Sequence, residues 1–277
     1  MHGSFRFYID KWPDKIQTSS ILDIFDMFSQ KLGIPFSKYT YTLYDSKVDD
    51  PIIYVEYNND EIGRSEFLVR DLTPPFICKP GSFTAPIIQA ADECDVLSIG
   101  APIRVNIQLP SKLIPMVIRV DYDCNFLKKD ADLLGMYKSF IKNLFIWGYS
   151  VNNSFLHLYL RQNTAFTLDC GQLGSWLSLE DKDNINKSLA HKTNGCVNCI
   201  MDVFMANSIR FDILQSETIR KITDVVGMEY TEIVSDNFMF ALPIGNKISS
   251  YYRKRYFRLV FQLRKLLKSA DLLARLK

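Results

Sequence analysis

Two cysteines spaced as Cys196-Val-Asn-Cys199 are the residues best placed for chemistry, and His191 lies five residues before them. Thiolates at this spacing can hold one zinc ion from a tight turn, but a structural zinc site normally needs four ligands. Cys170 or His157 would have to complete the set through the fold. A thioredoxin-like redox role would need the motif between a strand and a helix of a βαβ unit. The alternative is that both thiols cap or pack the first turn of a helix, and we expect no metal or cofactor.

A second set of polar residues could support a metal-dependent nuclease: Asp121, Asp123, Asp169, Glu180 and Lys182. That chemistry needs carboxylates on Mg²⁺ and a lysine beside the attacking water. The pair Asp121-Tyr-Asp123 sits at the end of a predicted strand, where it could hold a divalent ion, but a solvated turn has the same pattern. Glu180 and Lys182 lie in polar, loop-like sequence and could equally begin a helix. A nuclease-like enzyme is therefore kept as a second alternative function.

Most enzyme classes are disfavoured by what the sequence lacks. The chain has three histidines, which limits acid–base and metal chemistry. It contains no G-x-S-x-G, G-x-x-x-x-G-K-[ST], G-x-G-x-x-G or H-E-x-x-H motif. We therefore expect a binding protein without catalytic residues.

The charges are distributed unevenly along the 277 residues. Residues 251–277 carry nine of the 33 Lys and Arg residues and one of the 31 acidic residues, Asp271. The remaining 250 residues hold 24 basic and 30 acidic residues, so an acidic body precedes a basic end. This end could grip nucleic acid, lie on anionic lipid, or form a surface helix whose apolar stripe packs on the body. The candidate nucleic-acid or partner contacts are Arg253, Lys254, Arg255 and Arg258.

The acidic body has several clusters of carboxylates that could face a basic protein. Electrostatic complementarity of this kind speeds association and sets orientation, whereas the simpler explanation is ordinary solubility. The candidate partner-binding residues are Asp45, Asp49, Asp50, Asp60, Glu61, Asp92, Glu93, Asp95, Glu180, Asp181 and Asp183.

The elements that must position these residues mix strands and helices without a regular βαβ rhythm or a repeat period. Alternating or β-branched stretches predict strands at 5–9, 39–44, 52–57, 67–69, 103–107, 116–120, 155–160, 165–168 and 238–242. Helical spacing predicts helices at 21–32, 129–144, 197–206 and 216–226, the first and last ended by Gly33 and Gly227. The predicted fold class is α+β, a mostly antiparallel sheet with packed helices and an amphipathic basic C-terminal helix.

The predicted organisation is one compact α+β domain over residues 1–250, with a possible sub-boundary near 100–110, followed by the basic helix 251–277. The N-terminal sequence lacks the pattern of a secretory signal, and no stretch reaches the length of a membrane span. Six cysteines are too few for a disulfide scaffold at this length. These features favour a reduced, cytoplasmic protein.

The C-terminal half carries a family resemblance. It runs Phe211-Asp-Ile-Leu-x-x-Glu217-Thr-Ile-x-Lys-Ile-x-x-x-x-Gly227-x-Glu229-Tyr230, followed by Asp236-Asn-Phe-Met-Phe-Ala-Leu242-Pro. This rhythm of strand, capped helix, glycine and strand, over residues 150–245, resembles that of immunity proteins of bacterial polymorphic-toxin and secretion-system effector pairs.

The resemblance implies a non-catalytic inhibitor that neutralises a cognate toxin or effector protein by tight binding. The acidic body fits a basic nuclease-type toxin, whereas the basic end departs from that picture. The first alternative function is therefore a nucleic-acid-binding protein that uses residues 251–277.

Overall fold

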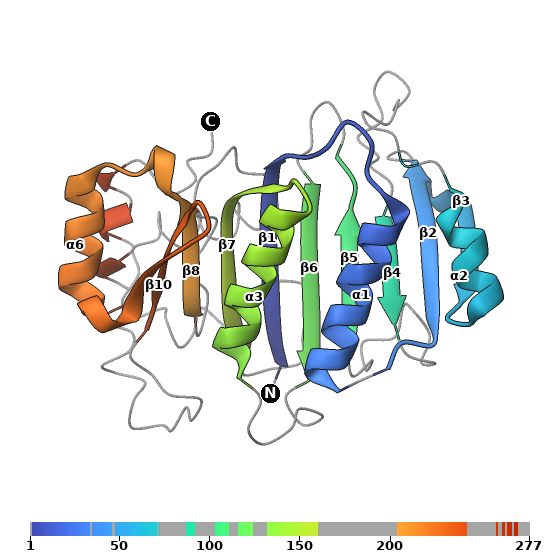
Figure 1. Cartoon of the computed structure of the whole chain (residues 1–277), viewed down its shortest axis with the longest axis horizontal. Helices are drawn as coiled ribbons and strands as arrows, with labels where there is room; N and C mark the ends of the chain where they lie inside the picture. Colours follow the sequence, from blue (N-terminus) through green and yellow to red (C-terminus); the bar gives the residue numbers. More distant parts are fainter. Residues whose placement is uncertain are drawn as a thin grey trace. The chain divides into compact units, whose positions relative to one another are not determined.

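The structure is a computed structural model (Figure 1) that describes residues 2–33, 35–45, 48–70, 72, 87–91, 103–110, 116–123, 132–159 and 204–242, with 259, 262, 263, 265–267, 269 and 270. The chain divides into two compact units, Met1–Ser150 and Val151–Lys277. Each unit is described by itself. The α+β class and the mostly antiparallel sheet are confirmed.

Unit 1 is built on an antiparallel sheet with the strand order β3-β2-β4-β5-β6-β1. The strands are β1 His2–Lys11, β2 Lys38–Asp45, β3 Val48–Asn58, β4 Ile87–Ala91, β5 Ile103–Gln108 and β6 Met116–Asp123. Because the strand period is two, β5 alternates between buried and half-buried residues, as its sequence predicts. The strand β3 is the last in this order, so it forms one edge of the sheet.

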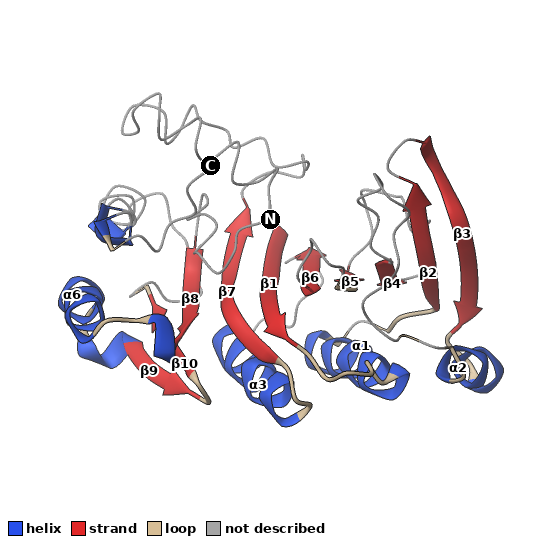
Figure 2. Ribbon diagram, turned by 90° about the horizontal axis from the view of Figure 1, so that it is seen from above, coloured by secondary structure: helices blue, strands red, loops and turns tan. Residues whose placement is uncertain are grey.

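Three helices lie on the same face of the unit 1 sheet, α1 Thr18–Leu32, α2 Glu61–Leu68 and α3 Leu133–Ile146 (Figure 2). Aromatic rings fill the space between helices and sheet. The ring centroids of Phe7 and Phe140 are 4.3 Å apart, and those of Phe28 and Phe140 are 4.6 Å apart. Burial of these rings, which come from β1 and from the apolar stripes of α1 and α3, is the main force that holds the layers together.

The helix ends follow local sequence chemistry. Gly33 ends α1 with φ 72°, a left-handed conformation, and donates its N–H to the Ser29 carbonyl at 2.9 Å. At the N-terminus of α1, Gln17 takes the extended cap position and its side chain makes no capping bond. The Ser20 hydroxyl instead donates to the Gln17 carbonyl at 2.7 Å.

Unit 2 has the strand order β7-β8-β10-β9, and its described pairs are antiparallel. Its elements are β7 Ser150–Tyr159, β8 Phe204–Arg210, η2 Phe211–Ile213, α6 Ser216–Val226, η3 Met228–Tyr230, β9 Thr231–Val234 and β10 Asn237–Ala241. The strand β7 begins at the boundary between the units. The amphipathic helix α6 contacts β10 and buries Ile222 and Val226.

Two secondary-structure predictions are wrong. Residues 67 and 68 end the helix α2 and residue 69 is its C-cap, so no strand forms at 67–69. Residues 204–206, predicted as the end of a helix at 197–206, belong to the strand β8, which pairs with β7 and β10. The predicted hairpin partner at 165–168 lies outside the described residues, and β7 pairs with β8 instead.

The described residues between 259 and 269 are helical, and Leu263 and Leu267 are fully buried while Lys265 is exposed. This burial confirms the predicted apolar face of the C-terminal helix. Among the described residues, no helix is long and apolar enough to cross a membrane. The β4–β5 pairing joins residues 87–91 to 104–108, and the predicted sub-boundary near 100–110 stays a prediction. The predicted boundary at 250 stays a prediction, because residues 243–258 lie outside the described part.

Candidate partner-binding surface

Exposed acidic and apolar side chains occur along β3 and α2, with Tyr54 and Glu56 on one face of the strand and Ile53 on the other. We call this group the β3–α2 surface and define it by Ile53, Tyr54, Glu56, Asp60, Glu61, Ile62, Glu66, Leu68 and Val69. Large apolar side chains on it are well exposed, with exposed fractions of 72% for Ile62 and 86% for Val69. Single exposed apolar side chains are common on protein surfaces, whereas a contiguous group of them marks an interaction site.

Local sequence explains why α2 presents these residues outward. Asp60 caps the helix, and its side chain accepts the N–H of Gly63 at 2.7 Å. Phe67 is fully buried, with its ring 5.5 Å from that of Tyr57. Because residues three, four and seven apart share a helix face, burial of one side directs Ile62, Glu66 and Val69 to the other.

Gly63 is required where α2 approaches β3 closely. A Cβ at this position would collide with the backbone oxygen and nitrogen of Asn58. The glycine therefore allows the first turn of α2 to lie directly against the end of β3.

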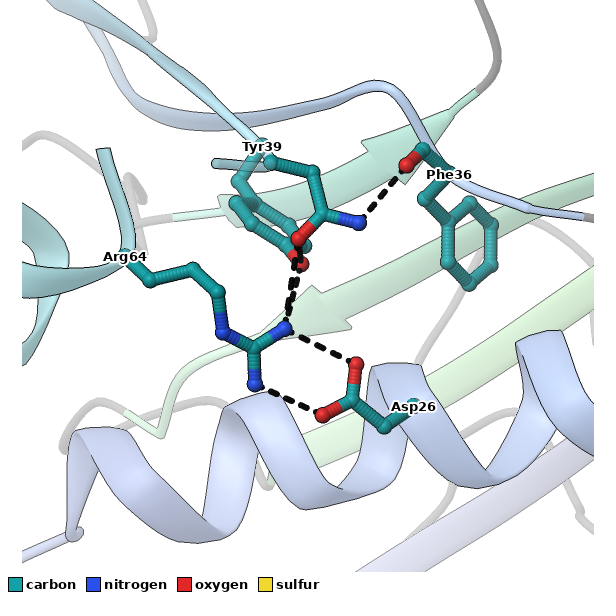
Figure 3. Close-up of polar contacts among 5 residues, drawn as sticks. Asp26, Phe36, Tyr39 and Arg64 are labelled. Carbon is teal, nitrogen blue, oxygen red and sulfur yellow. Dashed lines mark hydrogen bonds and ion pairs between the residues drawn. The ribbon is translucent and has the colours of Figure 1, made fainter. Parts of the chain in front are cut away.

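A polar network fixes α2 to the body of unit 1 (Figure 3). Arg64 donates to Asp26 of α1 through two bonds, from Nη1 at 3.0 Å and from Nη2 at 2.7 Å. Nη1 also donates to the Tyr39 hydroxyl at 3.0 Å and to Asn59 Oδ1 at 3.2 Å. Tyr39 donates to Asn59 Oδ1, and Asn59 Nδ2 donates to the Phe36 carbonyl at 2.7 Å. The network thus connects α1, β2 and α2, and we call it the Arg64 network.

The electrostatics of the Arg64 network favour a fixed, positioning role. Burial raises the pKa of Tyr39 to about 12, partly offset by the neighbouring Arg64. The hydrogen bond to Asp26 is the main cause that raises the pKa of Arg64. At neutral pH, Tyr39 therefore stays protonated as a donor and Arg64 stays charged, so neither group is poised to exchange a proton.

Arg70 is also held by internal partners. Its guanidinium lies 4.3 Å from the ring centre of Tyr41 and 5.6 Å from that of Tyr57. Its Nε donates to the Tyr57 hydroxyl at 2.7 Å. Stacking of this kind is favourable for a guanidinium and keeps the cation against the aromatic rings.

Because Arg64 and Arg70 are bound to side chains within unit 1, the exposed charges of β3 and α2 are mainly acidic. Residues 48–70 contain six acidic side chains and only these two basic ones, a net charge of −4. Glu56 forms an ion pair with Lys38, with 2.8 Å between Oε1 and Nζ. This hydrogen bond lowers the pKa of the Glu56 carboxyl. The described β3–α2 surface therefore carries exposed carboxylates as well as exposed apolar residues.

The structure brings together some of the residues predicted from the sequence. Asp60 and Glu61 lie on the β3–α2 surface, at the end of β3 that meets α2. Asp45, Asp49 and Asp50 lie at the opposite end of β3, where the β2–β3 hairpin pairs Asp45 with Val48. The remaining acidic candidates, Asp92, Glu93, Asp95, Glu180, Asp181 and Asp183, and the basic candidates Arg253, Lys254, Arg255 and Arg258 lie outside the described residues.

The described part of the chain contains no site for the predicted metal chemistry. Asp121 forms an ion pair with Arg119 Nε at 2.5 Å, and Asp123 lies opposite His2 in the β1–β6 register. Within the described residues, no group of three His, Cys, Asp or Glu side chains could hold a metal ion. His191, Cys196, Cys199, Cys170, Asp169, Glu180 and Lys182 lie outside them, so the zinc and nuclease alternatives stay predictions.

Sequence reasoning missed the outward face of α2. The available signal was Asp60 as a helix cap, followed by Ile62, Glu66 and Val69 at helical spacing. The Arg64 network was less accessible, because Asp26 and Arg64 are 38 residues apart.

Comparisons with known proteins bear on the fold. No family model matches the chain, and no curated protein does. Among solved structures, the chain is similar to the Pseudomonas aeruginosa T6SS protein PA0821, with a TM-score of 0.53 and 10% sequence identity. The match covers 97% of this chain and 72% of that chain. The protein therefore has an α+β fold of the type seen in a bacterial protein associated with a secretion system.

Proposed function

We propose that this chain is a non-catalytic cytoplasmic binding protein of the immunity type, which neutralises a cognate toxin by covering it. The observation that carries the proposal is the β3–α2 surface, where exposed apolar residues and carboxylates occur together while Arg64 and Arg70 are held by internal partners. The proposed partner is a protein with a basic surface that encloses apolar contact residues.

The character of the surface supports a protein partner. Apolar anchors supply most of the binding energy in the centre of an interface, and a polar rim completes it. Ile62, Leu68 and Val69 are suited to be anchors, whereas Asp60, Glu61 and Glu66 are suited to the rim. The negative rim would also speed the encounter with a basic partner and set its orientation.

The fixed position of α2 supports tight binding. Because the Arg64 network and the buried Phe67 already hold the helix, little conformational entropy is lost when a partner docks. The similarity in fold to a T6SS protein adds a secretion-system context, in which toxins and their inhibitors occur together.

Co-expression with the product of the neighbouring gene tests the proposal. We expect a 1:1 complex that survives purification at moderate salt, and we expect the chain to protect cells from that product. The chain should also lose protection when Ile62 and Val69 are both changed to lysine, while its thermal unfolding stays unchanged. If neither the wild type nor any variant protects cells from the products of neighbouring genes, the proposal is contradicted.

A further inference from the structure

The strand β3 exposes backbone groups at the edge of the unit 1 sheet. The Asn59 N–H donates to the Ser37 carbonyl at 2.7 Å, and the register places Asn58 opposite Lys38. In an antiparallel pair, hydrogen-bonded and non-bonded residue pairs alternate. The residues of β3 that bond to β2 are therefore the odd-numbered ones from 53 to 59, and the backbone of Glu56 points away from β2.

Both ends of this edge are occupied by other features. At one end, α2 lies against Asn58, because a Cβ at Gly63 would collide with its backbone oxygen and nitrogen. At the other end, the β2–β3 register shifts next to Leu43 and Tyr44, and Pro51 has no N–H to donate. Prolines and bulges are common devices that stop sheets from pairing at their edges. They leave a short stretch around Glu56 in which one more strand could be added.

We propose that β3 receives a short extended segment of the partner as an added strand, paired with residues 52–57 beside α2. This inference rests on the proposed function, because it specifies how the same surface holds a partner protein. Within the described residues, no strand pairs with this edge of β3.

The chemistry of the edge selects a basic segment. Alternate side chains of an added strand would lie next to Glu56 on one face and next to Ile53 on the other. Glu61 and Glu66 of the adjacent helix add negative charge. An extended segment that alternates basic and apolar residues matches both faces, and its main-chain hydrogen bonds would supply affinity, as in other cases of strand addition.

A proline at residue 56 tests this mode of binding. Glu56→Pro removes an N–H that faces away from β2, so the β2–β3 ladder is kept, whereas Glu56→Thr removes the same carboxylate and retains the N–H. Binding to the co-expressed neighbouring gene product is measured by calorimetry for wild type and both variants. Both variants lose the same carboxylate, so the comparison between them isolates the N–H, and the proline variant should bind about tenfold more weakly than the threonine variant. Thermal unfolding of both variants checks that the fold is retained.

Amide hydrogen exchange supplies a second readout that does not depend on substitutions. The amide of Glu56 should exchange rapidly in the free chain and become protected in the complex. Equal affinity of the two variants, together with an unprotected Glu56 amide, would overturn strand addition while leaving the proposed function intact. A wild-type chain that binds no neighbouring gene product would overturn both. A chain that instead dimerises through this edge, with a dimer broken by Glu56→Pro, would also overturn the inference.

Discussion

Arg64 of α2 and Asp26 of α1 form a two-point ion pair, with Nη1–Oδ1 at 3.0 Å and Nη2–Oδ2 at 2.7 Å. Two parallel bonds of this kind fix the orientation of both side chains as well as their distance. The pair therefore joins the helix that carries the exposed β3–α2 surface to a helix whose other face is buried in the core. Contacts made beneath the β3–α2 surface therefore hold it in place.

Substitution of Asp26 by asparagine should loosen α2. Because both side chains are about one-third exposed, solvent weakens the pair, and we expect a loss of about 1 kcal/mol in the free energy of unfolding. Urea unfolding of Asp26→Asn, Arg64→Gln and the double variant measures the coupling between the two. If the two single losses simply add, the pair does not act as a clamp.

Substitution of Gly63 by alanine should destabilise unit 1, although alanine favours helices. The new methyl group would collide with the backbone of Asn58, and we expect a cost of about 1–3 kcal/mol. Ser65→Ala is the matched control on the exposed side of the same helix and should change stability by less than about 0.5 kcal/mol. A Gly63→Ala variant as stable as this control would show that α2 does not lie against β3.

Substitution of Ser235 by glycine should stabilise unit 2. Ser235 has φ 57° in the two-residue turn between β9 and β10, and glycine adopts such a conformation without the steric cost of a side chain. We expect a gain of about 0.5–1 kcal/mol, measured by thermal unfolding. Ser235→Ala, which keeps a Cβ at the same backbone angle, should bring no such gain.

Alkaline pH should destabilise the protein through Tyr39. Burial raises its pKa from the usual 10 to about 12, so the folded state holds the hydroxyl proton more tightly than the unfolded state. The resulting stability is fully present below pH 10 and is lost as pH rises through 12, in total about 2–3 kcal/mol. Urea titrations from pH 8 to 12 should show a shallower decline for Tyr39→Phe. Burial also raises the pKa of Tyr41 and Tyr149, so some decline will remain.

The parts of the fold that the sequence predicted well are those in which local pattern and tertiary packing agree. The helix α1 combines a long apolar stripe with Gly33 at its end, and β5 alternates cleanly. In α2 the local pattern and the tertiary packing disagree, because Phe67-Leu68-Val69 has the composition of a strand. The helix depends on its cap at Asp60, which is a local signal, and on the burial of Phe67, which does not show in a short window of sequence.

The binding surface could be predicted only in part for a related reason. Charge counts identify Asp60 and Glu61 as acidic, because charge is a property of composition. The inward direction of Arg64 and Arg70, which leaves that acidity uncompensated outside, depends on Asp26, Tyr41 and Tyr57. These contacts join residues 13 to 38 positions apart, beyond the reach of any local motif.

The most direct test of the account is the affinity of a double charge reversal, Glu61→Lys with Glu66→Lys, for the co-expressed neighbouring gene product. The control is Asp224→Lys, the same type of change at an exposed helix residue of unit 2. The account predicts that the double variant binds about tenfold or more weakly and loses most of the salt dependence of wild type, while the control binds like wild type. Equal affinity and equal salt dependence for all three proteins would show that the β3–α2 surface is not where the partner binds.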